Sequence, residues 1–254
     1  MTKVITVINQ KGGVGKTTTA HAIGAWLQAK QNKKILFLDL DQQGNLTYAT
    51  GARNSNYNTL EVLVAGRLQD DKVQQTESGF NVIPSTPSLA NVDAVLSQTG
   101  KEYRLKEALK DLNSYDFVVI DTPPSLNIIT INALTASDYA VIPAQADIFS
   151  LQGITQLGQT IDAVKRYTNK DLKVLGIVLT KHNTRSILSR DLQKVITDTA
   201  IQLHTKVYTQ YIREAVAVRE AQAMKQDIFS YDPKNNATQD YDALMLEIWK
   251  DVNA

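Results

Sequence analysis

Short apolar runs, rich in β-branched and aliphatic residues, recur along this chain, and each is followed by a segment with helical spacing. A strand that is apolar throughout is typical of a sheet buried on both faces, because a strand with one solvated face alternates apolar and polar residues. Such strands in alternation with helices predict an α/β fold with a doubly wound, mostly parallel sheet and helices on both faces. The predicted strands span residues 3–8, 34–40, 80–85, 115–121, 138–144 and 173–180.

Three helical segments are the clearest in this pattern. The first spans residues 16–29. Another, between the last two predicted strands, turns one apolar face to the core: Leu151, Ile154, Leu157, Ile161 and Val164. The last twenty residues are amphipathic but acidic, and we expect them to dock on the chain's own core through Tyr241, Leu244, Met245 and Ile248.

No linker, repeat or low-complexity segment divides the chain. We therefore expect a single domain over residues 1–254. Because the first predicted strand begins at residue 3, we expect no N-terminal helix-turn-helix domain.

Composition narrows the functional classes. The 254 residues include no cysteine, which excludes disulfides, thiolate metal sites, iron–sulfur ligation and cysteine nucleophiles. No run reaches the roughly 18 apolar residues of a membrane span, and the N-terminus does not fit a signal peptide, so we expect a cytoplasmic protein without a membrane partner. The net charge is only +1, but residues 161–225 contain 12 Lys+Arg against 6 Asp+Glu. The basic excess is therefore local.

The stretch NQKGGVGKTTT, residues 9–19, joins the first predicted strand to the first predicted helix. Its glycines let successive backbone N–H groups turn inward and form a nest for phosphate oxygens at a helix N-terminus. Lys16 would bridge the β- and γ-phosphates, and the Thr17 hydroxyl would hold Mg²⁺. A turn that needs glycine for packing alone would not require Lys-Thr at this offset. The predicted nucleotide-binding residues of this loop are Gly12, Gly13, Val14, Gly15, Lys16, Thr17 and Thr18.

Two further segments place carboxylates at strand ends. In DLDQQGN, Asp39 and Asp41 are two residues apart, and both would face the phosphate loop if their strand neighbours the strand before that loop. Without the glycine loop, a pair of turn-favouring aspartates would be the preferred interpretation. In FVVIDTPPS, a buried strand ends in Asp121, which can hold Mg²⁺ through water. Pro123 and Pro124 cannot donate to a ladder, so this strand stops there.

These motifs together resemble the ParA/MinD class of P-loop ATPases. KGGVGKT resembles the deviant Walker A motif of that class, in which the extra lysine, here Lys11, reaches across a dimer interface to the partner's nucleotide. DLDQQGN resembles the family's DxDPQGN segment, with Gln42 in place of proline, and FVVIDTPPS resembles its DTPPSL segment. The likeness continues through residues 149–157, 212–222 and 231–241, and is weakest over 48–80.

The resemblance implies ATP and Mg²⁺ as cofactors and assigns further residues. Asp41 is the candidate that positions or activates the attacking water, beside the catalytic lysines Lys11 and Lys16. Asp39 is expected to give a supporting hydrogen bond or to hold a water on Mg²⁺. The remaining nucleotide contacts, including the adenine site near the later strand ends, are expected at Pro123, Thr180, Lys181, Ile212 and Arg213.

Composition separates the members of the class. A nitrogenase-type iron protein needs cysteines, a bacterial tyrosine kinase carries a tyrosine cluster in its tail, and a MinD-type ATPase ends in a basic amphipathic helix. The absence of cysteine excludes the first class, and the scattered tyrosines do not fit the second. The acidic C-terminal segment does not fit the third, because an anionic membrane would repel it. The remaining interpretation is a ParA-type partition ATPase: a weak Mg-dependent ATPase, dimeric with ATP, that associates with the nucleoid.

In that family, basic residues bind DNA without sequence preference in the ATP-bound dimer, and a ParB-type partner stimulates hydrolysis. The candidates for DNA contact are Arg185, Arg190, Lys194, Arg219 and Lys225. An ordinary solvated helix face is the competing interpretation of each of these cations. Two other functions stay open: a MinD-like positioning ATPase, and a nucleotide-switched regulator or scaffold with negligible turnover.

Overall fold

A seven-stranded sheet forms the centre of the protein, with the strand order β3-β4-β2-β5-β1-β6-β7. The structure is a computed structural model that describes residues 2–183 and 187–254, without the side chain of residue 188. All neighbouring strands are parallel except β3, which runs antiparallel to β4. The strands are β1 (Lys3–Val7), β2 (Ile35–Asp39), β3 (Gln74–Gln75), β4 (Asn81–Ile83), β5 (Phe117–Asp121), β6 (Tyr139–Ala144) and β7 (Lys173–Leu179).

Eleven α-helices in the described residues connect and cover these strands. They are α1 (Lys16–Gln31), α2 (Asn45–Ala49), α3 (Thr59–Ala65), α4 (Val92–Val95), α5 (Arg104–Leu109), α6 (Ile128–Ala136), α7 (Ile148–Tyr167), α8 (Ile187–Gln202), α9 (Val216–Ala223), α10 (Ile228–Tyr231) and α11 (Asn236–Val252). Three short 3₁₀ turns lie at Asp70–Lys72, Pro87–Asn91 and Lys101–Tyr103. Among the described residues, no helix has the length and apolar character to cross a membrane.

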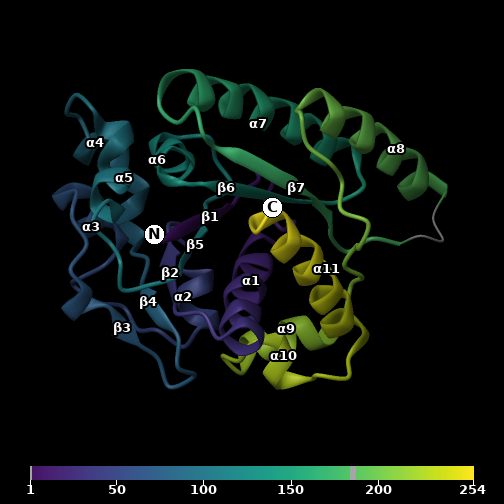
Figure 1. Ribbon diagram of the computed structural model, residues 1–254, viewed down its shortest axis with the longest axis horizontal. Helices are drawn as coiled ribbons and strands as arrows, with labels where there is room; N and C mark the ends of the chain where they lie inside the picture. Colours follow the sequence, from purple (N-terminus) through teal and green to yellow (C-terminus); the bar gives the residue numbers. More distant parts are fainter. Residues whose placement is uncertain (1, 184–186) are drawn as a thin grey trace.

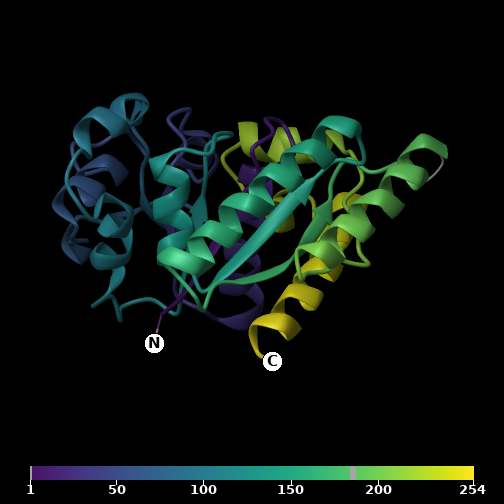
Figure 2. The ribbon, with the colours of Figure 1, turned by 90° about the horizontal axis from the view of Figure 1, so that it is seen from above.

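Helices cover both faces of the sheet, as the apolar strands predict. Figures 1 and 2 show α7 and α8 on one face and α1 and α11 on the other. Strand residues alternate between the two layers: Ile5 and Phe37 pack with α1 and α11, whereas Leu36 and Val118 pack with the helices of the opposite face. The predicted doubly wound, mostly parallel α/β fold is confirmed.

The predicted helix faces reach the core. On α7, Ile154, Leu157, Ile161 and Val164 are buried, and Leu151 is half-buried against the same cluster. On α11, the four predicted apolar residues are all buried against α1 and the sheet. The two-residue strand β3 was not predicted, because Gln74 and Gln75 carry no apolar signal and form only an edge pair with β4.

The strand order decides which carboxylates meet the glycine loop. β5 lies between β1 and β2, so the strand that ends in Asp39 does not neighbour the strand before the loop. In the register, Asp121 stands beside Val7 on one side and beside Asp39 on the other. Asp121 is therefore the carboxylate nearest the glycine loop in the sheet, and the loop after β2 approaches from one strand further away.

His21 lies inside the core, on the face of α1 that meets the sheet. Its ring makes edge contacts with Phe37 and Phe80, at centroid distances of 5.9 and 5.2 Å. Burial lowers the pKa of His21 to about 4, and Asp227 offsets this only in part. The native state therefore holds a neutral imidazole where the unfolded chain would hold a cation below pH 6.5.

Replacement of this imidazole should change how stability depends on pH. Because the folded-state pKa is lowered, the native state binds fewer protons, and the free energy of unfolding falls as the pH decreases from about 6.5 to about 4. A shift of this size corresponds to about 3 kcal/mol. His21→Leu should remove this part of the slope. Urea unfolding of both proteins at several pH values measures it, and parallel slopes would contradict a neutral buried His21.

Candidate nucleotide-binding site

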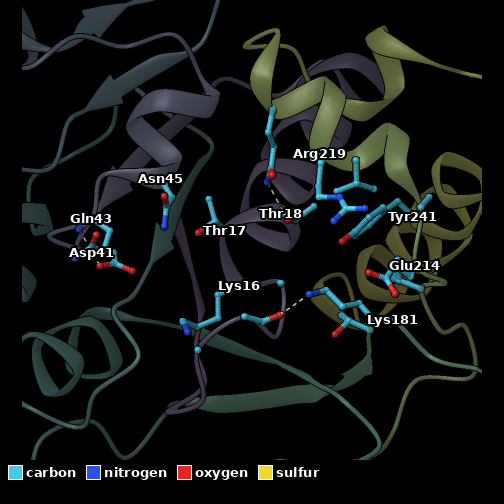
Figure 3. A pocket seen from close by; sticks show the side chains of 18 of the residues that line it. Lys16, Thr17, Thr18, Asp41, Gln43, Asn45, Lys181, Glu214, Arg219 and Tyr241 are labelled. Atoms are coloured by element: carbon cyan, nitrogen blue, oxygen red, sulfur yellow. Dashed lines mark hydrogen bonds between the residues drawn. The ribbon is translucent and has the colours of Figure 1, made fainter.

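One open cavity of about 650 Å³ lies at the carboxyl edge of the central strands. Three groups of residues line it: the glycine loop with the start of α1, the loop between β2 and α2, and residues 212–223 with α9. Figure 3 shows Asp41 and Thr17 toward one side and Arg219, Glu214 and Tyr241 toward the other. The volume suits a nucleotide-sized ligand, and this edge of an open α/β sheet is where such ligands bind.

Glycine is required in the loop for conformational reasons. Gly13 and Gly15 have φ values of 75° and 86°, which residues with a Cβ rarely adopt. Gly15 caps α1, and its carbonyl accepts a hydrogen bond from the Thr19 N–H at 2.9 Å. The amides of the first helical turn therefore open toward the cavity, where the helix dipole favours an anion.

Lys16 is the cation of this loop. Its side chain lines the cavity, and Nζ donates to the carbonyl oxygen of Lys11 at 3.0 Å. Burial lowers the pKa of Lys16, while the negative charges of Asp121 and Asp41 raise it. The ammonium is thus poorly solvated and close to two carboxylates, and an arriving phosphate would be a strong partner for it.

Thr17 and Asp121 form the candidate metal site. Thr17 Oγ1 donates to Asp121 Oδ2 at 2.6 Å, and the buried Asp121 Oδ1 has no hydrogen-bond partner among the described residues. Burial raises the pKa of Asp121 well above its usual value, Asp39 adds to this, and Thr17 and Lys16 oppose it. A divalent cation would satisfy the orphaned oxygen and relieve this charge repulsion.

The protein alone offers few ligands to such a cation. The described residues contain no group of three or more His, Cys, Asp or Glu side chains that could hold a metal ion. This suits Mg²⁺, which binds through one or two protein oxygens and completes its octahedron with water and substrate phosphates. The residues present therefore fit a nucleotide-bound Mg²⁺ held by Thr17 and Asp121.

Asp39 supports its own loop through hydrogen bonds, the first of the two roles considered for it. Its Oδ2 accepts from Thr47 N and Thr47 Oγ1, both at 2.7 Å, and its Oδ1 accepts from Asp41 N at 3.1 Å. Burial raises its pKa to about 6, although these hydrogen bonds oppose the rise. Asp39 does not line the cavity, and its carboxylate fixes the following loop and α2. The strand ends at Asp39, so the two-residue alternation does not carry on to Asp41.

Asp41 does reach the cavity. Its Oδ1 accepts from the backbone N–H of Gln43 at 3.0 Å, and its carbonyl oxygen accepts from Gly44 N at 2.9 Å and Ser85 Oγ at 2.5 Å. The residue is 6% exposed and lines the cavity on the side away from Arg219 and Tyr241 (Figure 3). The backbone of Asp41 is thus fixed on both sides, and one carboxylate oxygen stays directed at the cavity.

The end of β7 closes over the glycine loop. Thr180 Oγ1 donates to the carbonyl oxygen of Val14 at 2.8 Å, and Lys181 Nζ donates to that of Gly13 at 3.0 Å. Val14 itself is fully buried beneath the loop. Both Thr180 and Lys181 line the cavity, so the β7 end is in contact with the phosphate loop and with the expected adenine side.

Most of the predicted nucleotide contacts line this cavity, whereas Lys11, Val14, Asp39 and Pro123 do not. Pro124 lines the cavity, whereas the predicted Pro123 is buried. Arg213 lines it too, but its guanidinium is bound to Asp240 and not directed at a ligand. Asp39 lies behind its loop, as described above. The predicted residues that line the cavity are Gly12, Gly13, Gly15, Lys16, Thr17, Thr18, Asp41, Thr180, Lys181, Ile212 and Arg213.

Several lining residues were not predicted. They are Gln43, Asn45, Tyr48, Pro124, Glu214, Ala215, Val218, Gln222, Ala223 and Tyr241. Gln222 Nε2 donates to Thr18 Oγ1 at 2.9 Å and so connects α9 to the start of α1. Tyr241 was predicted as a core residue, and its periodicity in α11 gave no sign that it also borders a cavity. Most of these residues lie within or beside segments that carry the family resemblance, but the fold decides which of their side chains reach the cavity.

Lys11 lies outside the cavity that Lys16 lines. Its Nζ forms an ion pair with Asp147 Oδ2 at 2.5 Å and also donates to Gln145 Oε1 at 3.3 Å and Ser150 Oγ at 3.4 Å. Burial raises the pKa of Asp147, but the hydrogen bonds from Lys11 and Ser150 outweigh this and hold the pKa below its usual value. The ammonium group of Lys16 therefore lies at the cavity, whereas that of Lys11 lies outside it, beside the start of α7.

The predicted DNA-contacting cations do not form one patch. Arg190 and Lys194 lie exposed on α8, with Lys194 3.6 Å from Asp191. Arg219 on α9 lines the nucleotide cavity, and Lys225 lies over the ring of Tyr48 at 5.3 Å. Figure 1 shows α8 and α9 in different parts of the molecule. Arg185 lies outside the described residues.

A glycine-rich loop that opens a helix at the carboxyl edge of a parallel sheet, beside a strand ending in a buried aspartate, defines a P-loop nucleotide-binding protein. Comparison with known proteins agrees. The family model for an AAA domain matches residues 2–174. The chromosome partitioning protein ParA of Caulobacter vibrioides is 38% identical over 97% of this chain and 93% of its own.

Two further relatives match over nearly the whole length. The sporulation initiation inhibitor protein Soj of Bacillus subtilis is 38% identical over 100% of this chain and 99% of its own. A crystal structure of cobyrinic acid a,c-diamide synthase from Mycobacterium smegmatis with bound ADP and magnesium is 36% identical, covers 98% of this chain and 96% of that chain, and superposes with a TM-score of 0.78. The chain belongs to the ParA/Soj family of P-loop ATPases, and the predicted family is confirmed.

The position of Asp41 leads to a prediction about turnover. Asp41→Asn keeps an oxygen that can accept from Gln43 N but loses the charge needed to take a proton from water. We expect ATP affinity to change little and ATP hydrolysis to fall by at least about 100-fold. Phosphate release under single-turnover conditions measures this. Asp93→Asn, a surface change on α4, is the control, and normal turnover by Asp41→Asn would refute the assignment.

Proposed function

We propose that this chain is a ParA-type partition ATPase whose ATP-bound form dimerises and binds DNA without sequence preference. Membership of the ParA/Soj family makes it an ATPase that uses ATP and Mg²⁺. The observation that carries the rest of the proposal is the separation of the two motif lysines. Lys16 lines its own cavity, whereas Lys11 lies outside that cavity and is bound to Asp147.

Within one subunit, the residues divide the work on the triphosphate. The loop amides and Lys16 would bind the phosphate oxygens, and Thr17 and Asp121 would hold Mg²⁺, which when bound would supply charge neutralisation on the phosphates. Asp41 orients the attacking water and accepts its proton. Asp39 fixes the loop that carries Asp41 through its hydrogen bonds with Asp41 N and Thr47 Oγ1. Burial of Asp121 beside Asp39 and Asp41 favours a bound cation, because the cation offsets the repulsion between these carboxylates.

Lys11 would link nucleotide binding to assembly. In the single chain, its ammonium is satisfied by Asp147, Gln145 and Ser150, so it does not compete with Lys16 for the subunit's own phosphates. A second subunit that presents its triphosphate to this surface offers a more highly charged partner than one carboxylate. Lys11 would then exchange Asp147 for the partner's phosphates, and each nucleotide would join two subunits.

The cross-subunit role of Lys11 can be tested separately from nucleotide binding. Lys11→Ala should bind Mg-ATP with affinity close to the original, because the residue is outside the subunit's own cavity. It should fail to form dimers with a non-hydrolysed ATP analogue, as measured by sedimentation velocity. Lys33→Ala removes another half-exposed lysine, paired with Asp116, and should dimerise normally. Unchanged dimerisation of Lys11→Ala would contradict this role.

DNA binding would follow from dimerisation. The family resemblance and the local basic excess support a DNA-binding surface, and Arg190 and Lys194 on α8 are its best-placed members. Arg219 is a weaker candidate for DNA contact than these two residues, because it lines the nucleotide cavity. Two subunits double the phosphate contacts, and affinity falls steeply with salt when contacts are few. DNA residence, and with it association with the nucleoid, would depend on the nucleotide state, and a ParB-type partner would reset it by stimulating hydrolysis.

The contribution of α8 can be measured by paired charge reversals. Arg190→Glu with Lys194→Glu should weaken binding of the ATP-bound protein to nonspecific DNA and flatten the dependence of log affinity on log salt. Lys106→Glu with Lys110→Glu has the same spacing and the same change of charge at the end of α5, far from α8 (Figure 1), and should have little effect. Equal salt slopes for the two variants would contradict a DNA surface on α8.

The alternatives have weaker support. A MinD-like role would need an amphipathic helix free to meet lipid, but the apolar face of α11 is buried against α1 and the sheet. A nucleotide-switched scaffold without turnover would not need Asp41 in the cavity. The name of the Mycobacterium smegmatis structure points to amide synthesis. No observation on this chain favours that reaction over phosphate transfer to water.

A further inference from the structure

A segment that follows α8 extends the sheet beyond β7. We call this segment, residues 206–213, the strap. Isolated parallel bridges pair Ile177 with Val207 and Thr180 with Ile212. Tyr208 N donates to Ile177 O at 2.9 Å, and Ile212 N donates to Leu179 O at 2.8 Å. The strap therefore runs beside β7 toward the edge of the sheet that holds the nucleotide cavity.

Acidic side chains of α11 bind the strap along its length. Asp240, Glu247 and Asp251 are spaced by seven and four residues and so share one face of the helix. Asp251 accepts from Tyr208 Oη at 2.9 Å and from Lys206 Nζ at 2.8 Å. Glu247 accepts from the backbone N–H groups of the next two strap residues, at 3.2 and 2.9 Å. The acidic character of the C-terminal helix thus has a structural use within the chain.

Asp240 forms the strongest of these contacts, at the cavity end of the strap. Its Oδ2 accepts from Arg213 Nε at 2.7 Å and from Arg213 N at 3.1 Å, and its Oδ1 accepts from Arg213 Nη2 at 2.8 Å. Gln210 Nε2 adds a fourth contact at 3.3 Å. Asp240 is only 3% exposed. A buried carboxylate in a two-point pair with a guanidinium fixes direction as well as distance.

The position of Arg213 determines one wall of the nucleotide cavity. Ile212 and Arg213 line the cavity, and the chain then runs through Glu214 and Ala215 into α9, which supplies further lining residues. Figure 3 shows Glu214 and Arg219 on the side of the cavity away from Asp41. Asp240 does not itself line the cavity. It acts on this wall only through Arg213.

We propose that Asp240 is a positioning residue for the base and ribose of the nucleotide. Through Arg213, it holds the wall formed by residues 212–223 at the distance that the nucleoside requires, while the phosphates are bound by the glycine loop on the other side. This inference rests on the proposed function, since it assumes that ATP occupies the cavity. It makes nucleoside affinity dependent on the C-terminal helix.

Two ligands separate this role from general damage. Mg-ATP contacts both halves of the cavity, whereas Mg-tripolyphosphate contacts only the phosphate half. For Asp240→Asn, which keeps size but loses charge, we expect ATP affinity to fall by roughly tenfold and tripolyphosphate affinity to stay unchanged in calorimetric titrations. Glu247→Gln is the matched control, because it weakens the same strap from the same helix face farther from the cavity. It should leave both affinities unchanged.

A second variant checks the path of the effect. Arg213→Ala should lower ATP affinity in the same way, and the double variant should lose no more than either single one, because both act through one contact. Unchanged ATP affinity in Asp240→Asn, or an equal loss for tripolyphosphate, would overturn the proposal. If the unaltered chain bound no Mg-ATP, the proposed function itself would fail, whatever the variants did.

Discussion

The rest of the site depends on the hydrogen bond between Thr17 and Asp121. It joins the start of α1, directly after the glycine loop, to the end of the central strand β5. Asp121 ends a strand that lies between the strand of the glycine loop and the strand that leads to Asp41. Its carboxylate is fully buried: one oxygen accepts from Thr17, and the other has no hydrogen-bond partner in the part of the chain that the structure describes. Such a group is costly unless a cation meets it. The fold thus buries a carboxylate whose unpaired oxygen a divalent cation would satisfy.

The charged groups around Asp121 are Lys16, Asp39 and Asp41, and each has a different position relative to the cavity. Lys16 brings a poorly solvated ammonium, and Asp41 brings a carboxylate oxygen that faces the cavity. Asp39, two residues before Asp41, does not face the cavity. Both of its carboxylate oxygens accept hydrogen bonds from backbone and side-chain groups of the following loop and α2. The carboxylate of Asp39 therefore fixes the loop that presents the Asp41 side chain to the cavity.

In the proposals above, subunit assembly and nucleoside recognition depend on contacts outside the phosphate-binding part of the cavity. Lys11 forms an ion pair with Asp147 of its own subunit. In the proposed dimer, it would leave Asp147 only for a more highly charged group, such as the partner's triphosphate. On the opposite side, the strap and α11 hold the wall that borders the nucleoside. The same cavity is thus connected to a prospective subunit interface through one lysine and to the C-terminal helix through one arginine.

The sequence by itself determined the fold class, six of the seven strands, the phosphate loop, the carboxylates at two strand ends and the family, because these features depend on local periodicity and on residues a few positions apart. It did not determine that β5 separates β1 from β2, that Asp39 faces its own loop, or that Pro124 replaces Pro123 at the cavity. Nor did it show that Tyr241, Glu214 and Gln222 border the cavity, or that Arg213 is paired with Asp240. Those facts arise from contacts between segments up to about two hundred residues apart, as between Gln222 and Thr18. Only the packed sheet and its covering helices bring such residues together, since no short-range pattern along the chain specifies which distant side chain fills a given place.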